Sequence, residues 1–252
     1  MYRPRVIPCL LIQGKTLVKT VRFKNPRYLG DPLNAVRLFN ELEADELMVL
    51  DIDASREKRC IDLDLIKRIG EEANMPFSVG GGIANLDKIK SILAVGAERV
   101  VLGSSILQND FLSAASNQFG RSSIAVCIDV KNTLFRKNQV FVQNAKKHCS
   151  TDLTSHAIML QEQGAGEIIL QSVERDGTYA GLDIDSLEKL SKVLTIPLVG
   201  LGGLSSLAEI RECHNKLNLN GYAAGSLFSF QGKNQGVLIN YPSKSELREL
   251  FD

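Results

Sequence analysis

The sequence predicts an α/β fold, a single (β/α)8 or TIM barrel with a twofold internal half-barrel repeat. Two observations predict it. Short apolar runs alternate with helical patterns eight times along 252 residues, and such alternation is typical of a parallel sheet. In addition, Pro76-Phe77-Ser78-Val79-Gly80-Gly81-Gly82-Ile83 returns as Pro197-Leu198-Val199-Gly200-Leu201-Gly202-Gly203-Leu204. A duplicated half with eight strands in all favours a closed barrel over the alternative, an open doubly wound sheet.

The repeat extends beyond these glycine loops. Val100-Val101-Leu102-Gly103-Ser104 corresponds to Tyr222-Ala223-Ala224-Gly225-Ser226, and Ile7-Pro8-Cys9-Leu10-Leu11 corresponds to Ala125-Val126-Cys127-Ile128-Asp129. The chain length is typical of one barrel rather than two domains. We therefore expect one domain over residues 1–252, with half-barrels at about 1–120 and 121–252.

Apolar runs in the first half predict strands at 5–12, 46–51, 77–80 and 99–102. Residues 13–24 predict a loop or hairpin that turns at Gly14. The first helix is expected at 31–42, because Asp31 can cap its amino end and Pro32 suits its first turn. Further helices are expected at 63–73, 86–95 and 111–119.

The second half repeats this order. Strands are expected at 124–130, 167–171, 198–200 and 221–224, and helices at 153–163, 184–194, 207–213 and 244–251. A longer excursion over 131–150 separates the first of these strands from its helix. Within it, the alternation in Gln139-Val140-Phe141-Val142 predicts one arm of a hairpin.

Composition argues against several classes of function. A formal net charge of +1 provides no overall field for nucleic acid or an anionic membrane. No apolar run is long enough to span a bilayer, and the start Met1-Tyr2-Arg3-Pro4-Arg5 lacks the apolar core of a signal peptide. We expect a cytoplasmic protein with no nucleic-acid or membrane partner.

Metal and acyl-transfer chemistry also lack a signal. The five cysteines are odd in number and include no CxxC pair, so reduced thiols are expected. His148, His156 and His214 show no metal-ligand spacing, and no GxSxG motif occurs. We predict no metal and no cofactor.

In a barrel, the carboxyl ends of the strands carry the chemistry. These ends are expected at Leu11, Asp51, Gly82, Ser104, Asp129, Ser172, Gly203 and Ser226. The glycine loops let the backbone approach a ligand, and the helix starts after them favour an anion. Two such loops predict two anion sites across one mouth, and a ligand with a phosphate or other anion at each end.

The chain resembles the cyclase subunit of imidazole glycerol phosphate synthase, a barrel of histidine biosynthesis that receives ammonia from a glutaminase. The matching pieces span the chain and are Cys9-Leu10, Gly30-Asp31-Pro32, Asp45-Glu46-Leu47, Leu50-Asp51-Ile52, Gly80-Gly81-Gly82-Ile83, Ile128-Asp129, Gly164-Ala165-Gly166-Glu167-Ile168 and Arg175-Asp176-Gly177-Thr178. The resemblance implies a glutaminase partner and a phosphorylated small-molecule substrate.

The resemblance also implies which residues bind that substrate. Gly82, Gly103 and Ser104 would form one phosphate site, and Asp176, Gly177, Gly203 and Ser226 the other. Asp51 and Lys19 join the candidates for substrate binding, since both border the predicted mouth. For Lys19, as for Lys15 and Lys24, the alternative is a solvated surface.

The main departure from the family is Leu11. The family uses aspartates at the ends of strands one and five as an acid/base pair, and the repeat assigns Leu11 and Asp129 to these positions. A positioned proton-transfer group typically contributes about 10²–10⁴ in rate. Asp129 is therefore the candidate catalytic residue, with a buried structural acid as the alternative. Asp51, Asp53 and Asp176 are candidates to replace the lost acid.

Four charged residues lie at the opposite ends of the strands: Arg5, Glu46, Arg99 and Glu167. Their alternating signs could close a ring. The resemblance implies a salt-bridged ammonia gate here, in which the family has lysine at position 99. Solvated caps at strand starts are the alternative.

Three segments resemble a paralogous branch of the family more closely: Cys9-Leu10-Leu11, Lys19-Thr20-Val21-Arg22-Phe23-Lys24-Asn25-Pro26-Arg27-Tyr28 and Gly225-Ser226-Leu227-Phe228-Ser229-Phe230-Gln231-Gly232-Lys233. That branch is associated with acetamidino modification of surface-polysaccharide sugars, where a separate amidotransferase acts on a nucleotide-linked sugar. The hypothesis is an ammonia-handling barrel of this kind. A histidine-pathway cyclase and a non-catalytic ammonia-conducting scaffold are the alternatives.

Overall fold

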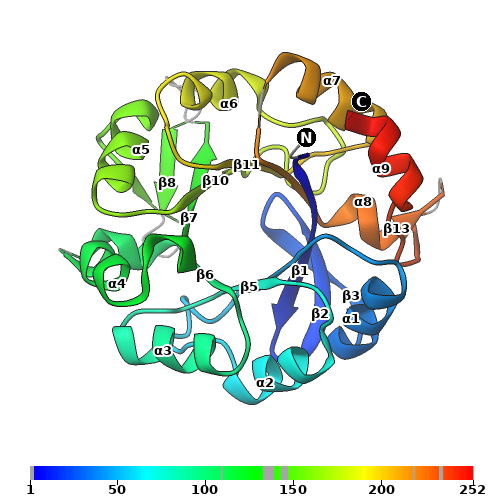
Figure 1. Ribbon diagram of the computed structural model, residues 1–252, viewed down its shortest axis with the longest axis horizontal. Coiled ribbons are helices and arrows are strands. Elements are labelled where there is room, and N and C mark those ends of the chain that lie inside the picture. The colour runs from blue at the N-terminus through cyan, green and yellow to red at the C-terminus, as the bar shows by residue number, and fades with distance from the viewer. Residues whose placement is uncertain are drawn as a thin grey trace.

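Eight parallel strands close into a barrel (Figure 1). The structure, a computed structural model, describes residues 3–108, 110–132, 139–142, 147–217, 219–232 and 235–251. The barrel strands are β1 (Arg5–Gln13), β4 (Leu47–Asp51), β5 (Phe77–Gly80), β6 (Arg99–Leu102), β7 (Ile124–Lys131), β10 (Glu167–Ser172), β11 (Leu198–Leu201) and β12 (Gly221–Ala224). Parallel pairing of the last barrel strand, β12, with the first, β1, and of β10 with β7 closes the barrel. The predicted fold class is confirmed.

Helices surround the barrel (Figure 1). They are α1 (Pro32–Glu41), α2 (Leu63–Glu72), α3 (Leu86–Ala94), α4 (Phe111–Phe119), α5 (Leu153–Glu162), α6 (Ile184–Ser191), α7 (Leu207–Lys216) and α9 (Lys244–Phe251). The Asp31 side chain accepts hydrogen bonds from the backbone N–H groups of Leu33 and Asn34, as the sequence indicated. Among the helices of the described ranges, none is both long and apolar enough to cross a membrane.

The buried apolar residues form two clusters. The larger lies between the barrel and its helices. The smaller fills the barrel interior, with contributions such as Ile7 from β1, Met48 from β4, Val101 from β6 and Ile169 from β10. The interior is thus an apolar core between the two ends of the barrel.

Each half inserts a hairpin after its first strand. Residues predicted as a loop or hairpin form β2 (Thr16–Val21), which pairs with both β1 and β3 (Lys24–Gly30). β7 is followed in the same way by β8 (Gln139–Val142) and β9 (Lys147–His148). The arm predicted at 139–142 is confirmed, although much of the excursion around it lies outside the described residues. These matching hairpins support the duplication, while the half-barrel boundaries remain a prediction.

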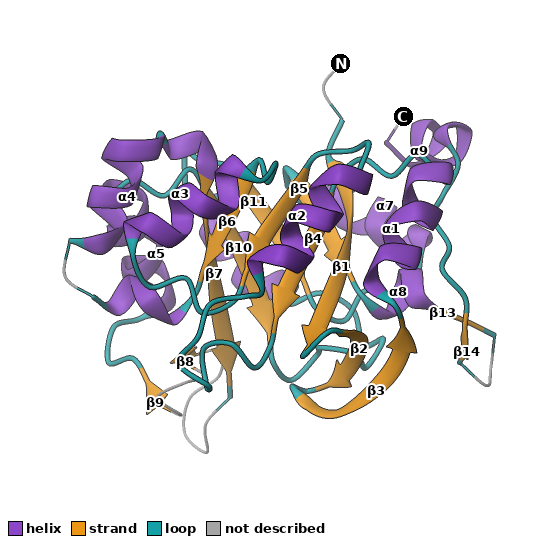
Figure 2. Ribbon diagram, turned by 90° about the horizontal axis from the view of Figure 1, so that it is seen from below, coloured by secondary structure: helices purple, strands orange, loops and turns teal. Residues whose placement is uncertain are grey.

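Several short elements were not predicted. They are the turns η1 (Ser104–Leu107) and η2 (Arg121–Ser123), the helix α8 (Ser226–Ser229), and the pair β13 (Phe230–Gln231) and β14 (Gly236–Val237). Elements of two to four residues are too short to show a period. β3 was missed because Asn25, Pro26 and Gly30 read as loop residues. In Figure 2 the strands point downward, and β2 and β3 lie beyond the carboxyl ends of the barrel strands.

Candidate functional site

Asp129 lies near the carboxyl end of β7, beside Gln171 of β10 in the strand register. The Cys127 thiol lies 3.8 Å from both Asp129 Oδ1 and Gln171 Oε1. Burial raises the pKa of Asp129 to about 7, a hydrogen bond from Cys127 acts to lower it, and the charge of Asp176 acts to raise it further. A carboxyl with a pKa near the working pH is suited to proton transfer.

Leu11 offers no second acid to this site. Its side chain is buried in the inner apolar cluster, and its neighbours in the strand register are Leu50 of β4 and Val18 of β2. The position that the repeat pairs with Asp129 is therefore part of the apolar core, so any acid/base pair here must use another carboxyl.

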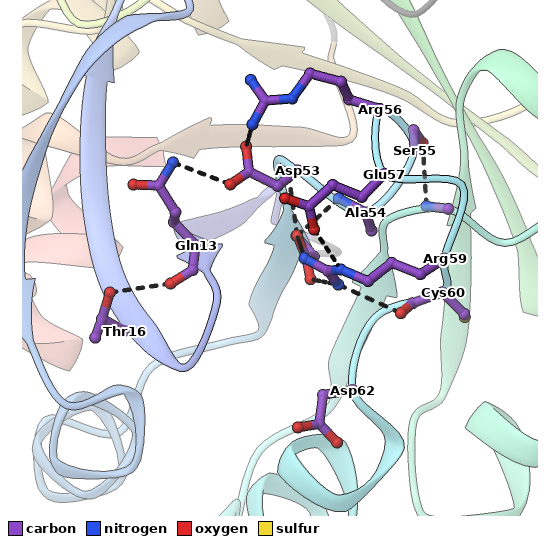
Figure 3. Close-up of polar contacts among 12 residues, drawn as sticks. Gln13, Thr16, Asp53, Ala54, Ser55, Arg56, Glu57, Arg59, Cys60 and Asp62 are labelled. Carbon is purple, nitrogen blue, oxygen red and sulfur yellow. Dashed lines mark hydrogen bonds and ion pairs between the residues drawn. The ribbon is translucent and has the colours of Figure 1, made fainter.

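Asp53 lies in the loop between β4 and α2 (Figure 3), and Asp51 ends β4 shortly before it. Asp51 Oδ1 accepts from the backbone N–H groups of Asp53 and Ala54, both at 3.0 Å, and Asp51 Oδ2 lies 2.6 Å from Arg59 Nη1. Asp53 pairs with Arg56 at 2.8 Å. The hydrogen bonds and ion pairs of both carboxylates stabilise this loop. A contact of Asp51 with substrate stays a prediction.

Lys19 and Asp176 are brought together, although 157 positions separate them. Lys19 Nζ lies 2.9 Å from Asp176 Oδ1, and each side chain is only 6% exposed. Thr20 Oγ1 donates to Asp176 Oδ2 at 3.2 Å, and the backbone N–H of Arg22 donates to the Asp176 carbonyl at 2.9 Å. These contacts hold the hairpin against the loop that follows β10, at the mouth.

At three of the predicted phosphate-site glycines, backbone packing leaves no room for a side chain. A Cβ at Gly82 would lie 1.8 Å from the carbonyl oxygen of Arg59, and one at Gly203 would lie 2.2 Å from that of Gly181. At Gly177 the corresponding distance to the Thr20 carbonyl oxygen is 2.4 Å. All three have a positive φ. Close backbone approach therefore requires glycine here whether or not an anion binds.

Gly103 differs, because a Cβ there would meet nothing within 4 Å and its φ is negative. We predict that Gly82→Ala lowers the free energy of unfolding by more than about 1 kcal/mol, and by more than Gly103→Ala does, because only the methyl group at position 82 would clash with backbone. Urea denaturation of the two variants measures this difference. Equal losses of unfolding free energy in the two variants would contradict the packing explanation. Weaker ligand binding in Gly103→Ala, without a loss of stability, would assign position 103 to binding.

The remaining predicted phosphate-site residues begin short helical segments: Ser104 begins η1, and Ser226 begins α8. The Tyr179 hydroxyl donates to the Ser226 carbonyl at 3.3 Å, which ties the loop after β10 to the loop after β12. Two cavities flank the glycine loops outside the strand ends. One of about 500 Å³ is lined by Arg59, Gly82 and Lys88 among others, and one of about 470 Å³ includes Arg175 and Gly181. Asp129 lines neither, so the proton-transfer candidate stands apart from both.

At the opposite end of the barrel, four side chains form a closed ring of ion pairs. Arg5 contacts Glu46, at 2.6 Å, and Glu167. Arg99 Nη1 lies 3.4 Å from Glu46 and 3.3 Å from Glu167. The strand start is one residue later than predicted, because β4 begins at Leu47 and Glu46 precedes it.

The ring is buried. Glu46 is 3% exposed and Glu167 is 5% exposed, which rules out solvated strand caps. Burial raises the pKa of Glu46, although Arg5 and Arg99 act to lower it. For Arg5, burial acts to lower the pKa, but the attraction of Glu167 and Glu46 outweighs it and raises the pKa overall. A neutral set of two cations and two anions thus closes the amino end of the barrel.

A sequence profile described as "Histidine biosynthesis protein" matches residues 5–234, nearly the whole barrel. The chain belongs to this family.

The individual relatives show that the chain belongs to the HisF branch of this family. A Leptospira interrogans protein, provisionally named imidazole glycerol phosphate synthase subunit HisF, is 46% identical over 256 residues and covers all of both chains. A Vibrio vulnificus protein, provisionally named as subunit hisF3, is 45% identical over 254 residues, covering 100% of this chain and 98% of its own. A Streptococcus sanguinis protein, whose name as imidazole glycerol phosphate synthase subunit HisF is not provisional, is 34% identical over 231 residues. The match covers 91% of this chain and 92% of that protein. The chain is a HisF-like barrel.

Sequence reasoning did not assign two neighbours of Asp129, Cys127 and Gln171, to the site of this HisF-like barrel. Strand parity could have found them. Since Glu167 faces inward at the ring, Gln171 faces inward four residues later on the same strand. No metal-binding group of three or more His, Cys, Asp or Glu side chains occurs within the part of the chain that the structure describes.

Proposed function

We propose that this chain is the ammonia-accepting barrel of a glutamine-dependent complex, and that a glutaminase docks over Arg5, Glu46, Arg99 and Glu167. The observation that carries the proposal is the buried ring at one end of an apolar interior, with Asp129 at the other end. Buried ion networks rarely add net stability, so their retention favours a functional role. Neutral ammonia can cross an apolar interior at a far lower cost than a charged ion.

The proposed acceptor of the ammonia is a nucleotide-linked sugar destined for a surface polysaccharide, bound by a separate sugar amidotransferase. Leu11 supports an acceptor other than the histidine-pathway substrate, since the barrel lacks the acid pair of an ordinary cyclase. The similarity to a numbered HisF subunit of Vibrio vulnificus supports a paralogue beside a histidine-pathway copy. Reaction at the barrel itself would use Asp129.

Glutaminase activation tests this proposal. The purified glutaminase partner from the same organism should bind the chain and turn over glutamine at least about tenfold faster with it. Arg99→Met removes one cation of the ring, so it should weaken activation by a similar factor, whereas Arg68→Met on the exposed face of α2 should not. Absence of both binding and activation would contradict the proposal.

The second candidate is a histidine-pathway cyclase that tolerates Leu11. It is favoured by the retained Asp129 and glycine loops and by relatives named imidazole glycerol phosphate synthase subunit HisF. The third is a scaffold that conducts ammonia without chemistry of its own.

Complementation of a strain lacking the histidine-pathway cyclase separates these candidates. We predict no growth with the unaltered chain, because a missing proton-transfer group typically costs about 10²–10⁴ in rate. Growth with it would establish the second candidate. Growth only with Leu11→Asp would show that the ancestral binding site persists, and failure of both soluble proteins would support a different acceptor.

A further inference from the structure

Positive charge is concentrated on the hairpin at the mouth. Residues 13–30 contain five lysines and arginines and no aspartate or glutamate, in a chain whose net charge is only +1. Lys19 is buried against Asp176. The other four cations, Lys15, Arg22, Lys24 and Arg27, are exposed. The hairpin therefore presents a locally basic surface that the overall charge conceals.

Exposed apolar side chains gather at the same end. Among the described large apolar residues, the most exposed are Val21, Tyr28, Leu38, Leu107, Met159, Val237 and Leu238. Only Leu38 and Met159 lie on the outer helices α1 and α5; the other positions belong to segments that follow the carboxyl ends of β1, β6 and β12. Tyr28 is 65% exposed. Such gathering marks an interaction surface more often than scattered apolar residues do.

Two of these segments are in contact with each other. The guanidinium of Arg27 lies over the ring of Phe230, 5.0 Å from its centroid, which joins β3 to β13. β14 pairs with β13 (Figure 2), so Val237 lies opposite Phe230, and Leu238 is the next residue along the chain. We call Lys24, Arg27, Tyr28, Val237 and Leu238 the rim patch. It combines apolar side chains with cations at the end of the barrel where Asp129 lies.

We propose that the rim patch docks the enzyme that consumes the ammonia, through an acidic surface on that enzyme. The inference rests on the proposed function: a barrel that hands ammonia to another protein needs a partner over its mouth as well as one over its ring. Cations on the patch would steer an acidic partner and fix its orientation, while Tyr28, Val237 and Leu238 supply the buried contacts.

The partner contacts side chains of the patch rather than extending the sheet. Among the described strands β3 pairs only with β2, so its other edge is open. That edge carries Lys24, Pro26 and Arg27, and charged residues and proline discourage the addition of a further strand.

The test reconstitutes three purified proteins: this chain, its glutaminase and the candidate sugar amidotransferase of the same organism. Amidation of the nucleotide-linked sugar is measured with glutamine and, separately, with ammonium chloride. The charge-reversal variant Lys24→Glu/Arg27→Glu should lower glutamine-driven turnover at least about tenfold and leave ammonium-driven turnover unchanged. Arg68→Glu/Lys90→Glu reverses the same number of charges on α2 and α3 and should change neither rate.

Direct binding of the amidotransferase to the chain, with and without the substitutions, completes the test. Binding should weaken about tenfold in the rim variant and with added salt. Unchanged binding, or no binding by the unaltered chain, would overturn the inference. Loss of uridine diphosphate binding in the rim variant, with amidotransferase binding intact, would instead assign the patch to a nucleotide. Glutaminase activation by the same variants is measured in parallel. If the unaltered chain does not activate the glutaminase, the proposed function fails; if activation is normal but the amidotransferase does not bind, only the rim-patch inference fails.

Discussion

Replacing Glu46 with alanine is expected to lower the free energy of unfolding by about 3–5 kcal/mol. The substitution leaves Arg5 and Arg99, whose side chains are only 16% and 18% exposed, with Glu167 as their one partner in the ring, so two cations face one anion. The unpaired charge has little access to water, because the guanidinium side chains are mostly covered. Urea denaturation at pH 7 measures the loss.

Two control variants test whether burial of the ring causes the loss of stability. Glu188→Ala removes an exposed partner of Lys192, from an ion pair of 2.6 Å on α6, and should change stability little because water screens that pair. Replacing Arg5 and Arg99 with methionine together with Glu46 and Glu167 with leucine should restore stability close to that of the unaltered chain while abolishing glutaminase activation. A loss in Glu46→Ala no greater than in Glu188→Ala would contradict a buried ring.

The sequence was most informative where local pattern determines structure. Barrel strands such as 77–80 and 99–102 were placed without error because short apolar runs ended in glycine. The cap at Asp31 was placed for the same local reason. The edge strand β3 was missed because its exposure removes the alternation on which strand prediction depends.

The candidate site depended more on contacts between distant segments. No local pattern indicates that Lys19 pairs with Asp176, because that contact arises only when the hairpin folds over the mouth. The glycines at 82 and 203 were assigned to anion sites from the sequence, yet close backbone packing also requires them. By contrast, the internal repeat alone paired Leu11 with Asp129, and the inward-facing side chains of β1 and β7 are consistent with that pairing.

Asp129 should make stability depend on pH in a direction opposite to an ordinary surface carboxylate. Its pKa is about 7 in the folded chain, chiefly through burial, and about 3.9 in an unfolded chain. Between these values the folded state holds a proton that the unfolded state releases. The stabilisation from the protonated form is complete below about pH 4, is lost as the pH rises to about 7, and stays lost above it.

Asp129→Asn is therefore expected to stabilise the chain at pH 8 by up to about 4 kcal/mol, since each pKa unit corresponds to about 1.36 kcal/mol. At pH 4 the variant should differ little from the unaltered chain, because a protonated carboxyl and an amide are both neutral. Asp152→Asn is the matched control: hydrogen bonds from Ser155 and other capping contacts lower the pKa of Asp152, so it should show no gain at pH 8. Denaturant titrations at the two pH values measure the difference. An equal effect of Asp129→Asn at both would show that folding does not raise the pKa of Asp129. A gain at pH 8, accompanied by loss of amidation, would show that Asp129 is kept for its chemistry at a cost in stability.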